Sequence, residues 1–169
     1  MFNESASNSA GGAVHGYFCT STFSGCHFDF NQSGFGGAVS AYFSNRDIVD
    51  CFFQGNTALA RGGALDNFNG ESYVTDCTFE SNVTLGAPPD GYGGGVHDYQ
   101  TTSHYSNCVF RQNYTSDNTS GGGAFLYASQ STFDACLFDS NFAGYGAGIY
   151  NASSTTALTD CEFVQNFAM

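Results

Sequence analysis

Short apolar segments alternate with polar residues along the whole chain, and one such segment recurs six times. In each copy a phenylalanine stands two residues after a cysteine. Residues i and i+2 of a strand share one face, so this pattern predicts short strands with a buried face. The cysteines are Cys26, Cys51, Cys77, Cys108, Cys136 and Cys161, and the phenylalanines are Phe28, Phe53, Phe79, Phe110, Phe138 and Phe163. We expect these side chains to form the core.

Other columns of residues accompany this pair at fixed distances. A triplet of glycine and alanine begins at Gly11, Gly36, Gly62, Gly93, Gly122 and Gly146. The apolar residues after the triplets are Val14, Val39, Leu65, Val96, Phe125 and Ile149, and three places further on stand Tyr17, Tyr42, Phe68, Tyr99, Ala128 and Ala152. Matched residues in a repeat of roughly 25–31 residues predict that each copy is one turn of a parallel β-solenoid.

Each strand ends at an asparagine, and these are Asn31, Asn56, Asn82, Asn113, Asn141 and Asn166. We expect asparagine to adopt the left-handed conformation that a corner needs, and its amide to hydrogen-bond from turn to turn. The small triplets have two interpretations: a cramped corner inside the coil, or a bare strip on which a neighbouring molecule lies. The sequence favours the corner.

The paired motifs resemble those of a known family. "FDFN" at 28–31, "FESN" at 79–82, "GGAV" at 36–39 and "GGGV" at 93–96 are similar to motifs in the passenger regions of chlamydial polymorphic outer-membrane proteins, which are pectin-lyase-like right-handed β-helices. The resemblance covers nearly the whole chain, although the array here is short. It implies a right-handed coil with a surface-exposed adhesive or scaffolding role. We therefore expect an all-β, right-handed parallel β-helix of about six rungs.

The repeat pattern begins and stops within a copy. Phe2 and Ser5 occupy the phenylalanine and asparagine places of a first copy, and the last copy stops at Met169 before another triplet. We expect residues 1–169 to form a single β-helix segment, uncapped at both ends. Either it is part of a longer protein, or its ends pack against neighbouring subunits in a fibre.

The charge balance excludes some partners. The chain has 15 acidic residues against three basic ones, and its formal net charge is −12. Such a chain is repelled by phosphate backbones and by anionic lipid, so we expect no nucleic-acid binding. No apolar run approaches the roughly 20 residues of a membrane helix, so we expect no direct membrane insertion.

Cysteines and sequons suggest little chemistry. We expect the cysteine column to be a stack of buried thiols, with bridged pairs as the alternative and Cys19 outside the column. No Cys-x-x-Cys spacing occurs, so we expect no metal and no cofactor. Candidate glycosylation sequons stand at Asn118, Asn151, Asn3, Asn82, Asn113 and Asn31. Asn118 and Asn151 are the better candidates, because the corner asparagines are expected to be buried.

A catalytic set is conceivable on the outer surface. Asp50, Asp76 and Glu80 are expected near one another with Arg111 one turn on, where carboxylates holding Ca²⁺ could abstract a proton from a uronic acid. The simpler interpretation is a cross-strand charge pairing of Arg111 with Glu80 and Asp139.

Two further columns carry polar residues. His97 beside Asp66, with His15 further along the column, is a weaker acid/base or metal candidate, and we expect a solvated surface histidine. The serine and threonine places of successive copies are interrupted by Asn45 and Arg46, which excludes a flat ice-binding array and predicts a polar turn.

Two connections are longer than the others. They run from Val83 to Tyr92 and from Tyr114 to Gly121, on consecutive turns, so we expect them to project side by side and to carry any binding residues. The sequence thus predicts a structural or adhesive, non-catalytic extracellular or cell-surface protein. Its expected partners are neighbouring subunits or flanking repeats of the same protein, and glycans. The alternatives are a lyase-like polysaccharide enzyme and a carbohydrate-binding module.

Overall fold

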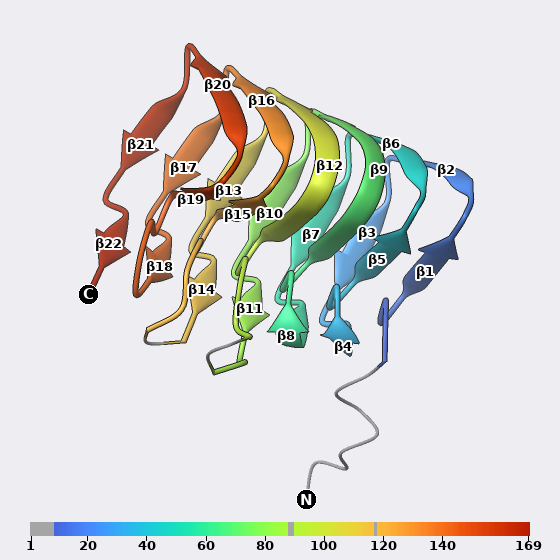
Figure 1. Cartoon of the computed structure of the whole chain (residues 1–169), viewed down its shortest axis with the longest axis horizontal. Coiled ribbons are helices and arrows are strands. Elements are labelled where there is room, and N and C mark those ends of the chain that lie inside the picture. The colour runs from blue at the N-terminus through green and yellow to red at the C-terminus, as the bar shows by residue number, and fades with distance from the viewer. Residues whose placement is uncertain (1–8, 88–89, 117) are drawn as a thin grey trace, which may run out of the picture.

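The chain winds into six turns of parallel β-strands. The computed structural model describes residues 9–87, 90–116 and 118–169, and these form 22 strands and no helix. Successive turns lie side by side along the long axis, from β1–β4 at one end to β19–β22 at the other (Figure 1). The predicted all-β parallel β-helix is confirmed.

Every turn contributes to three parallel sheets. The first sheet has two halves: β1 (Val14–Tyr17), β5 (Val39–Tyr42), β9 (Leu65–Thr75), β12 (Val96–Ser106), β15 (Ala124–Tyr127) and β19 (Ile149–Ala152), then β2 (Thr20–Ser24), β6 (Asn45–Val49), β16 (Gln130–Asp134) and β20 (Thr155–Thr159). The second sheet contains β3 (His27–Asp29), β7 (Phe52–Gln54), β10 (Thr78–Glu80), β13 (Val109–Arg111), β17 (Leu137–Asp139) and β21 (Glu162–Val164). The third contains β4 (Gln32–Phe35), β8 (Thr57–Arg61), β11 (Val83–Thr84), β14 (Tyr114–Thr115), β18 (Phe142–Ala143) and β22 (Phe167–Ala168).

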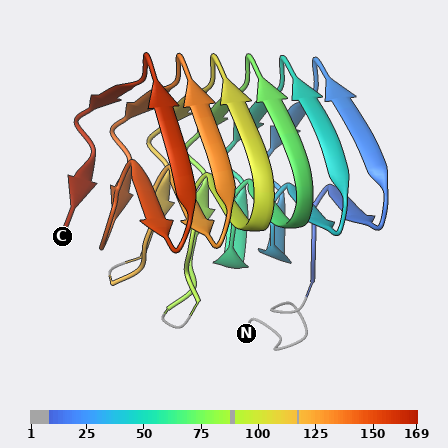
Figure 2. The same ribbon diagram turned by 45° about the horizontal axis from the view of Figure 1, so that its top comes forward.

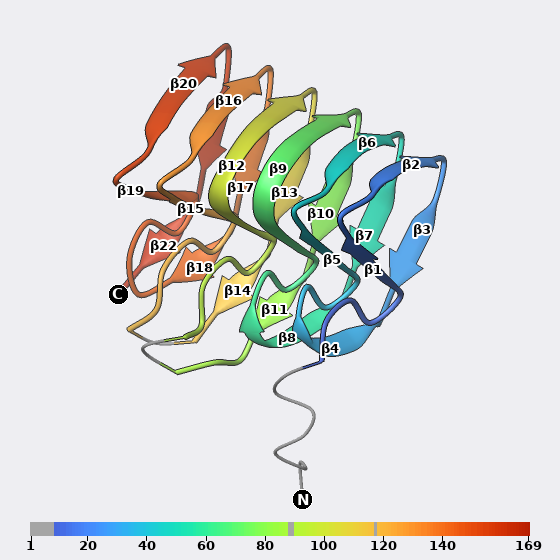
Figure 3. The ribbon, with the colours of Figure 1, turned by 45° about the vertical axis from the view of Figure 1, so that its right-hand side comes forward.

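The first sheet bends in the middle of each turn. In β9 and β12 one strand of 11 residues continues through the bend, whereas the other turns use two shorter strands. Figure 2 shows these long strands side by side at the front of the molecule, and Figure 3 shows the coil from nearer its axis. One broad, curved outer face results.

The core is a set of stacks along the axis. The phenylalanine stack runs from Phe28 to Phe163, with neighbouring ring centroids 4.7–4.9 Å apart and ring planes within 8° of parallel. Its central members are fully buried, while Phe163 in the last turn is 47% exposed. In-register parallel pairing causes this stacking, because identical places on successive turns lie one strand spacing apart.

The cysteine column lies beside the phenylalanines. Cys51, Cys77, Cys108 and Cys136 are buried, Cys26 and Cys161 in the outer turns are partly exposed, and all six thiols are free, as is the exposed Cys19. Each thiol of the column donates a hydrogen bond to the carbonyl oxygen two residues earlier, for example Cys77 Sγ to Thr75 O at 3.1 Å. The thiols therefore behave as small buried groups with a local acceptor.

The asparagines form the predicted ladder of amides. Asn82 Nδ2 donates to Asn113 Oδ1 at 3.0 Å, Asn113 Nδ2 donates to Asn141 Oδ1 at 3.0 Å, and the same bond recurs in the other turns. The prediction that asparagine itself is left-handed was wrong. Positive φ belongs to the preceding residue of each turn, which is Phe30, Gly55, Ser81, Gln112, Ser140 or Gln165. The turn thus reverses one residue earlier and directs the amide inward.

The small triplets are cramped corners. The first glycine of each has a positive φ, for example +58° at Gly36. A Cβ on the second glycine, Gly37, would lie 2.0 Å from the carbonyl oxygen of Gly63 in the next turn. The close approach is therefore made by the same chain, and the interpretation as a strip for a neighbouring molecule is not needed.

The fifth triplet begins one residue earlier than predicted. Gly121 has the positive φ, and Ala124, not Phe125, pairs with Val96 and Ile149. Three consecutive glycines made the register ambiguous by one residue, and a one-residue shift exchanges the two faces of a strand. Phe125 consequently points outward beside His97. Tyr127 takes the place predicted for Ala128, which instead forms the bend with φ +51°.

One arginine lies inside the coil, where a polar turn was predicted. Arg46 belongs to β6 and is 2% exposed. Its Nη1 donates to Asn67 Oδ1, Asn67 Nδ2 donates to Asp98 Oδ1 at 2.6 Å, and the Tyr105 hydroxyl donates to Asp98 Oδ2 at 3.0 Å. Burial lowers the pKa of Arg46 to about 10, and burial raises the pKa of Asp98. The inward alternation of β6 places Arg46 here.

Candidate functional site

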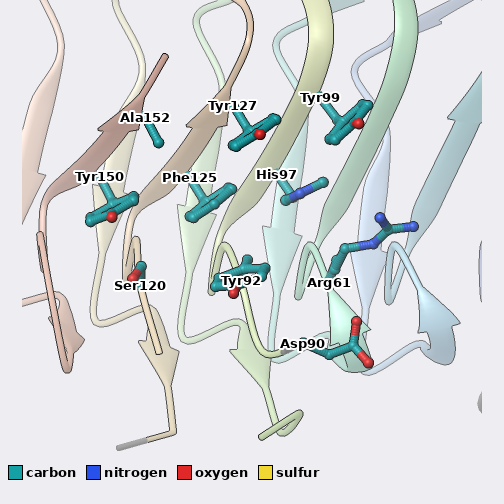
Figure 4. A pocket seen from close by; sticks show the side chains of 10 residues that line it. All are labelled: Arg61, Asp90, Tyr92, His97, Tyr99, Ser120, Phe125, Tyr127, Tyr150 and Ala152. Atoms are coloured by element: carbon teal, nitrogen blue, oxygen red, sulfur yellow. The ribbon is translucent and has the colours of Figure 1, made fainter. Parts of the chain in front are cut away.

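An aromatic groove lies on the outer face of the first sheet. It encloses about 360 Å³ and is bounded by β12, β15 and β19 on one side and by the segments that precede the glycine triplets on the other (Figure 4). Its lining residues are Arg61, Asp90, Tyr92, His97, Tyr99, Ser120, Phe125, Tyr127, Tyr150 and Ala152. We treat this groove as the candidate functional site.

One wall of the groove is formed by Tyr99 and Tyr127, the last two members of a stack of four rings that we call the outer ladder. Tyr42, Phe68, Tyr99 and Tyr127 are register partners, with successive centroids 4.8, 4.7 and 5.3 Å apart and ring planes within 13° of parallel. The next register partner is Ala152, which carries no ring. The outer ladder therefore stops within the groove.

The floor is a second stack, which we call the inner ladder. It consists of His97, Phe125 and Tyr150, with successive centroids 5.3 Å apart. Tyr92 stacks on Phe125 from the opposite wall at 4.3 Å. Strand alternation places the two ladders two residues apart on the same outward face.

A buried acid–base pair stands at one end of the inner ladder, where Asp66 is the register partner of His97. His97 Nδ1 is 2.7 Å from Asp66 Oδ1, and the exposed fractions of the two residues are 1% and 0%. The prediction of a solvated surface histidine was wrong, because the His97 ring is packed against the rings of Phe125 and Tyr99 and is almost fully buried. Asp66 Oδ2 is also buried and makes no hydrogen bond within the described residues.

One cation faces the groove. The Arg61 guanidinium lies over the ring of Phe35, 4.6 Å from its centroid, and Arg61 Nη2 donates to the Tyr42 hydroxyl at 3.1 Å. Burial raises the pKa of Tyr42, and the nearby charge of Asp66 acts in the same direction. Among residues 9–87, 90–116 and 118–169, no carboxylate lies within ion-pair distance of Arg61.

Both longer connections reach this groove. Asp90 and Tyr92 come from the first and Ser120 from the second. The two lie side by side, since Ser116 Oγ donates to Gly86 O at 2.5 Å and β11 pairs with β14. Residues 88, 89 and 117 of these connections lie outside the described residues.

The proposed lyase-like residues do not converge. Arg111 Nη2 forms an ion pair with Glu80 Oε2 at 2.8 Å on the second sheet, and Asp139 is the register partner of Arg111 on the other side. Asp50 and Asp76 are exposed and sit at positive-φ corners before that sheet. Four residues of extended chain, about 13 Å, separate Asp76 from Glu80. The described part of the chain holds no group of three or more His, Cys, Asp or Glu suited to a metal ion.

The sequons divide as the repeat suggests. Asn82 and Asn113 are fully buried, and Asn31 is partly buried with its amide in the ladder. Asn118 and Asn151 are exposed. Asn3 lies outside the described residues, as do Phe2 and Ser5.

Comparison with known proteins supports the fold. A family model described as a right-handed beta helix region matches residues 90–168, just under half of the chain. The chain is a right-handed parallel β-helix. No curated protein matches the sequence. Within the described ranges there is no helix long and apolar enough to cross a membrane.

Sequence reasoning missed the groove because its walls come from different columns. The residue before each triplet, such as Phe35, Arg61 or Tyr92, was left out of the repeat analysis, although large side chains recur there. These residues pair between turns, for example Arg61 with Tyr92. The recurrence of large side chains before the triplets could have indicated this wall of the groove. The wrong register at the fifth triplet also placed Phe125 and Tyr127 on the wrong faces of their strand.

Proposed function

We propose that this β-helix is a non-catalytic, extracellular adhesion module that binds a neutral polysaccharide in the aromatic groove. The observation that carries the proposal is the lining itself. Six of its ten residues are aromatic or imidazole rings, namely Tyr92, His97, Tyr99, Phe125, Tyr127 and Tyr150. Apolar rings with a few polar groups are typical of ligand sites, and sugar rings offer both CH faces and hydroxyls to such a surface.

Charge favours an uncharged ligand. The groove lining carries Arg61 and Asp90, one cation and one anion, whereas the whole chain has a net charge of −12. An anionic polymer approaching the molecule would be repelled over most of the surface. The extended outer face of the first sheet would accommodate a chain longer than one sugar, and the resemblance to surface-exposed β-helices supports an adhesive role outside the cell.

Isothermal titration with neutral and acidic oligosaccharides tests this proposal. We expect Tyr127→Ala to weaken binding of a neutral oligosaccharide about tenfold, because one stacking platform is lost. Tyr73→Ala is the matched control: Tyr73 is 47% exposed, Tyr127 is 40% exposed, and Tyr73 lies outside the groove. Failure of the unaltered protein to bind any neutral oligosaccharide would refute the proposal.

A polysaccharide-active enzyme is the second candidate. The Asp66–His97 pair at the groove floor favours it, since an imidazole oriented by a carboxylate is a common general base. New reducing ends or unsaturated products released from a bound polysaccharide, and lost in His97→Gln, would replace the first proposal with this one.

A further inference from the structure

The end of the outer ladder within the groove forms a ring-sized notch. Register pairing places Ala152 next to Tyr127, in the place that a ring occupies in each of the five preceding turns. The inner ladder continues to Tyr150 at the same level. The notch is therefore bounded by the face of Tyr127, the side of Tyr150 and the methyl group of Ala152 (Figure 4).

The dimensions of the notch follow from the ladder. Rings in the outer ladder stack 4.7–5.3 Å apart, which is within the range of ring stacking in proteins. A ring stacked on Tyr127 at that distance would lie over Ala152, where a methyl group leaves the space open. Tyr127 is 40% exposed, whereas Phe68 and Tyr99 each have a ring stacked on both sides.

The chemistry of the notch is polar but uncharged. Tyr127 and Tyr150, which bound the notch, both carry hydroxyl groups, and Ser120 offers another hydroxyl elsewhere in the lining. Arg61 and Asp90 lie at the opposite end of the groove (Figure 4). An uncharged ring with one apolar face and hydroxyls at its rim matches this environment.

We propose that the notch takes one pyranose ring of a neutral polysaccharide, stacked on Tyr127 as the next ring of the outer ladder. This inference rests on the proposed function and makes it specific. The groove would recognise a sugar with equatorial substituents, because axial substituents would keep its CH face from the ring of Tyr127. Ala152 is then a specificity residue, since any ring at this place would exclude the sugar.

Filling the notch tests the proposal. The probes are cellotetraose and tetra-N-acetylchitotetraose, which are neutral and have equatorial substituents. We expect Ala152→Tyr to weaken binding at least about tenfold while the melting temperature does not fall, because the added ring extends the ladder. Ala157→Tyr adds the same ring at an exposed place on β20 outside the groove, and it should bind as the unaltered protein does.

The outcomes separate the two proposals. Unaltered binding in Ala152→Tyr, together with binding lost on Tyr127→Ala, would overturn the notch and leave the groove. No binding by the unaltered protein would defeat the proposed function itself.

Displacement of the oligosaccharide by a phenylalanine-containing peptide would identify the occupant as an aromatic side chain and overturn the sugar. If Ala152→Tyr does not fold, Ala152→Leu, which also fills the notch, takes its place and must weaken binding. The chain has no tryptophan, so a ligand-induced change in tyrosine fluorescence that disappears in Tyr127→Phe gives a second readout.

Discussion

Arg46 and Asp98 are opposite charges inside the coil that are joined through an amide. Asn67 accepts from the guanidinium and donates to the carboxylate, so the charges stand two turns apart. Taking two ions out of water costs several kcal/mol each, and the network offsets this only while all its members are present. The pKa shifts of both groups indicate that burial opposes their charged forms.

Removing one charge should therefore cost more than removing both. We expect Arg46→Met to lower the free energy of unfolding by about 3–5 kcal/mol, because Asp98 is left buried without its counter-charge. The double variant Arg46→Met/Asp98→Leu should recover most of that loss. Urea unfolding followed by circular dichroism measures both. A double variant that is less stable than Arg46→Met would show that the network stabilises the fold beyond charge compensation.

In the strands, the asparagine ladder connects neighbouring turns through side chains as well as backbone. Asn113 Oδ1 accepts from both nitrogens of Asn82, the amide N and Nδ2, and Asn113 Nδ2 donates to Phe79 O and Asn141 Oδ1. These bonds satisfy backbone groups that the corner would otherwise leave unpaired in the core.

Cutting the ladder in the middle should be costly. Asn113→Ala removes the acceptor of the Asn82 N–H and of Asn82 Nδ2 and one donor to the Phe79 carbonyl, all in the buried core, and each lost partner costs about 1–3 kcal/mol. We expect a total loss of about 2–5 kcal/mol in the free energy of unfolding. Asn31→Ala is the comparison, because Asn31 is partly exposed and, among the described residues, its side chain hydrogen-bonds to Asn56 only. Equal losses in both variants would mean that the ladder contributes little.

The predictable part of this molecule is the part that repeats. Cysteine, phenylalanine and asparagine recur at one spacing, so parallel pairing, the stacked core and the amide ladder followed from the sequence. The position of the residue with positive φ could not be predicted from the sequence, because Phe30, Gly55 and Ser81 share no residue type. Propensity would not place phenylalanine at positive φ, and neighbouring turns impose it here.

Residues that occur in only one turn were harder to place. Arg46 is unique in its column, and its polarity suggested solvent although strand alternation directs it inward. The covered Asp66–His97 pair depends on rings from other segments that shield it. Packing between different segments decides which side chains cover an outward-facing column. A single sequence does not give the distances between those segments.

At the scale of the whole molecule, the β-helix is a stack of six similar turns. Each turn contacts its neighbours, so stability is close to a sum over turns and their interfaces. Ala124 pairs with Ile149, and therefore deleting residues 124–148 brings Ile149 to the place next to Val96 without a register change.

This deletion should give a shorter β-helix that still unfolds cooperatively. We expect unchanged strand content per residue by circular dichroism and a denaturant m-value lower by about one sixth, in proportion to the surface lost. Deleting residues 124–135, about half a turn, should abolish the cooperative transition, because it misaligns every column that follows. Similar behaviour of the two deletions would contradict a stack of interchangeable turns.

The parallel register also determines how the molecule would respond to mechanical load. Backbone bonds between turns point along the axis, and the first and last turns lie at opposite ends of the coil (Figure 1). Tension between these ends would break the backbone hydrogen bonds of one turn before those of the next turn carry the load. A released turn of about 25 residues could extend by roughly 80 Å, whereas it occupies only about 4.8 Å of the axis when folded. A β-helix of this kind would lengthen stepwise under tension and keep its remaining turns folded.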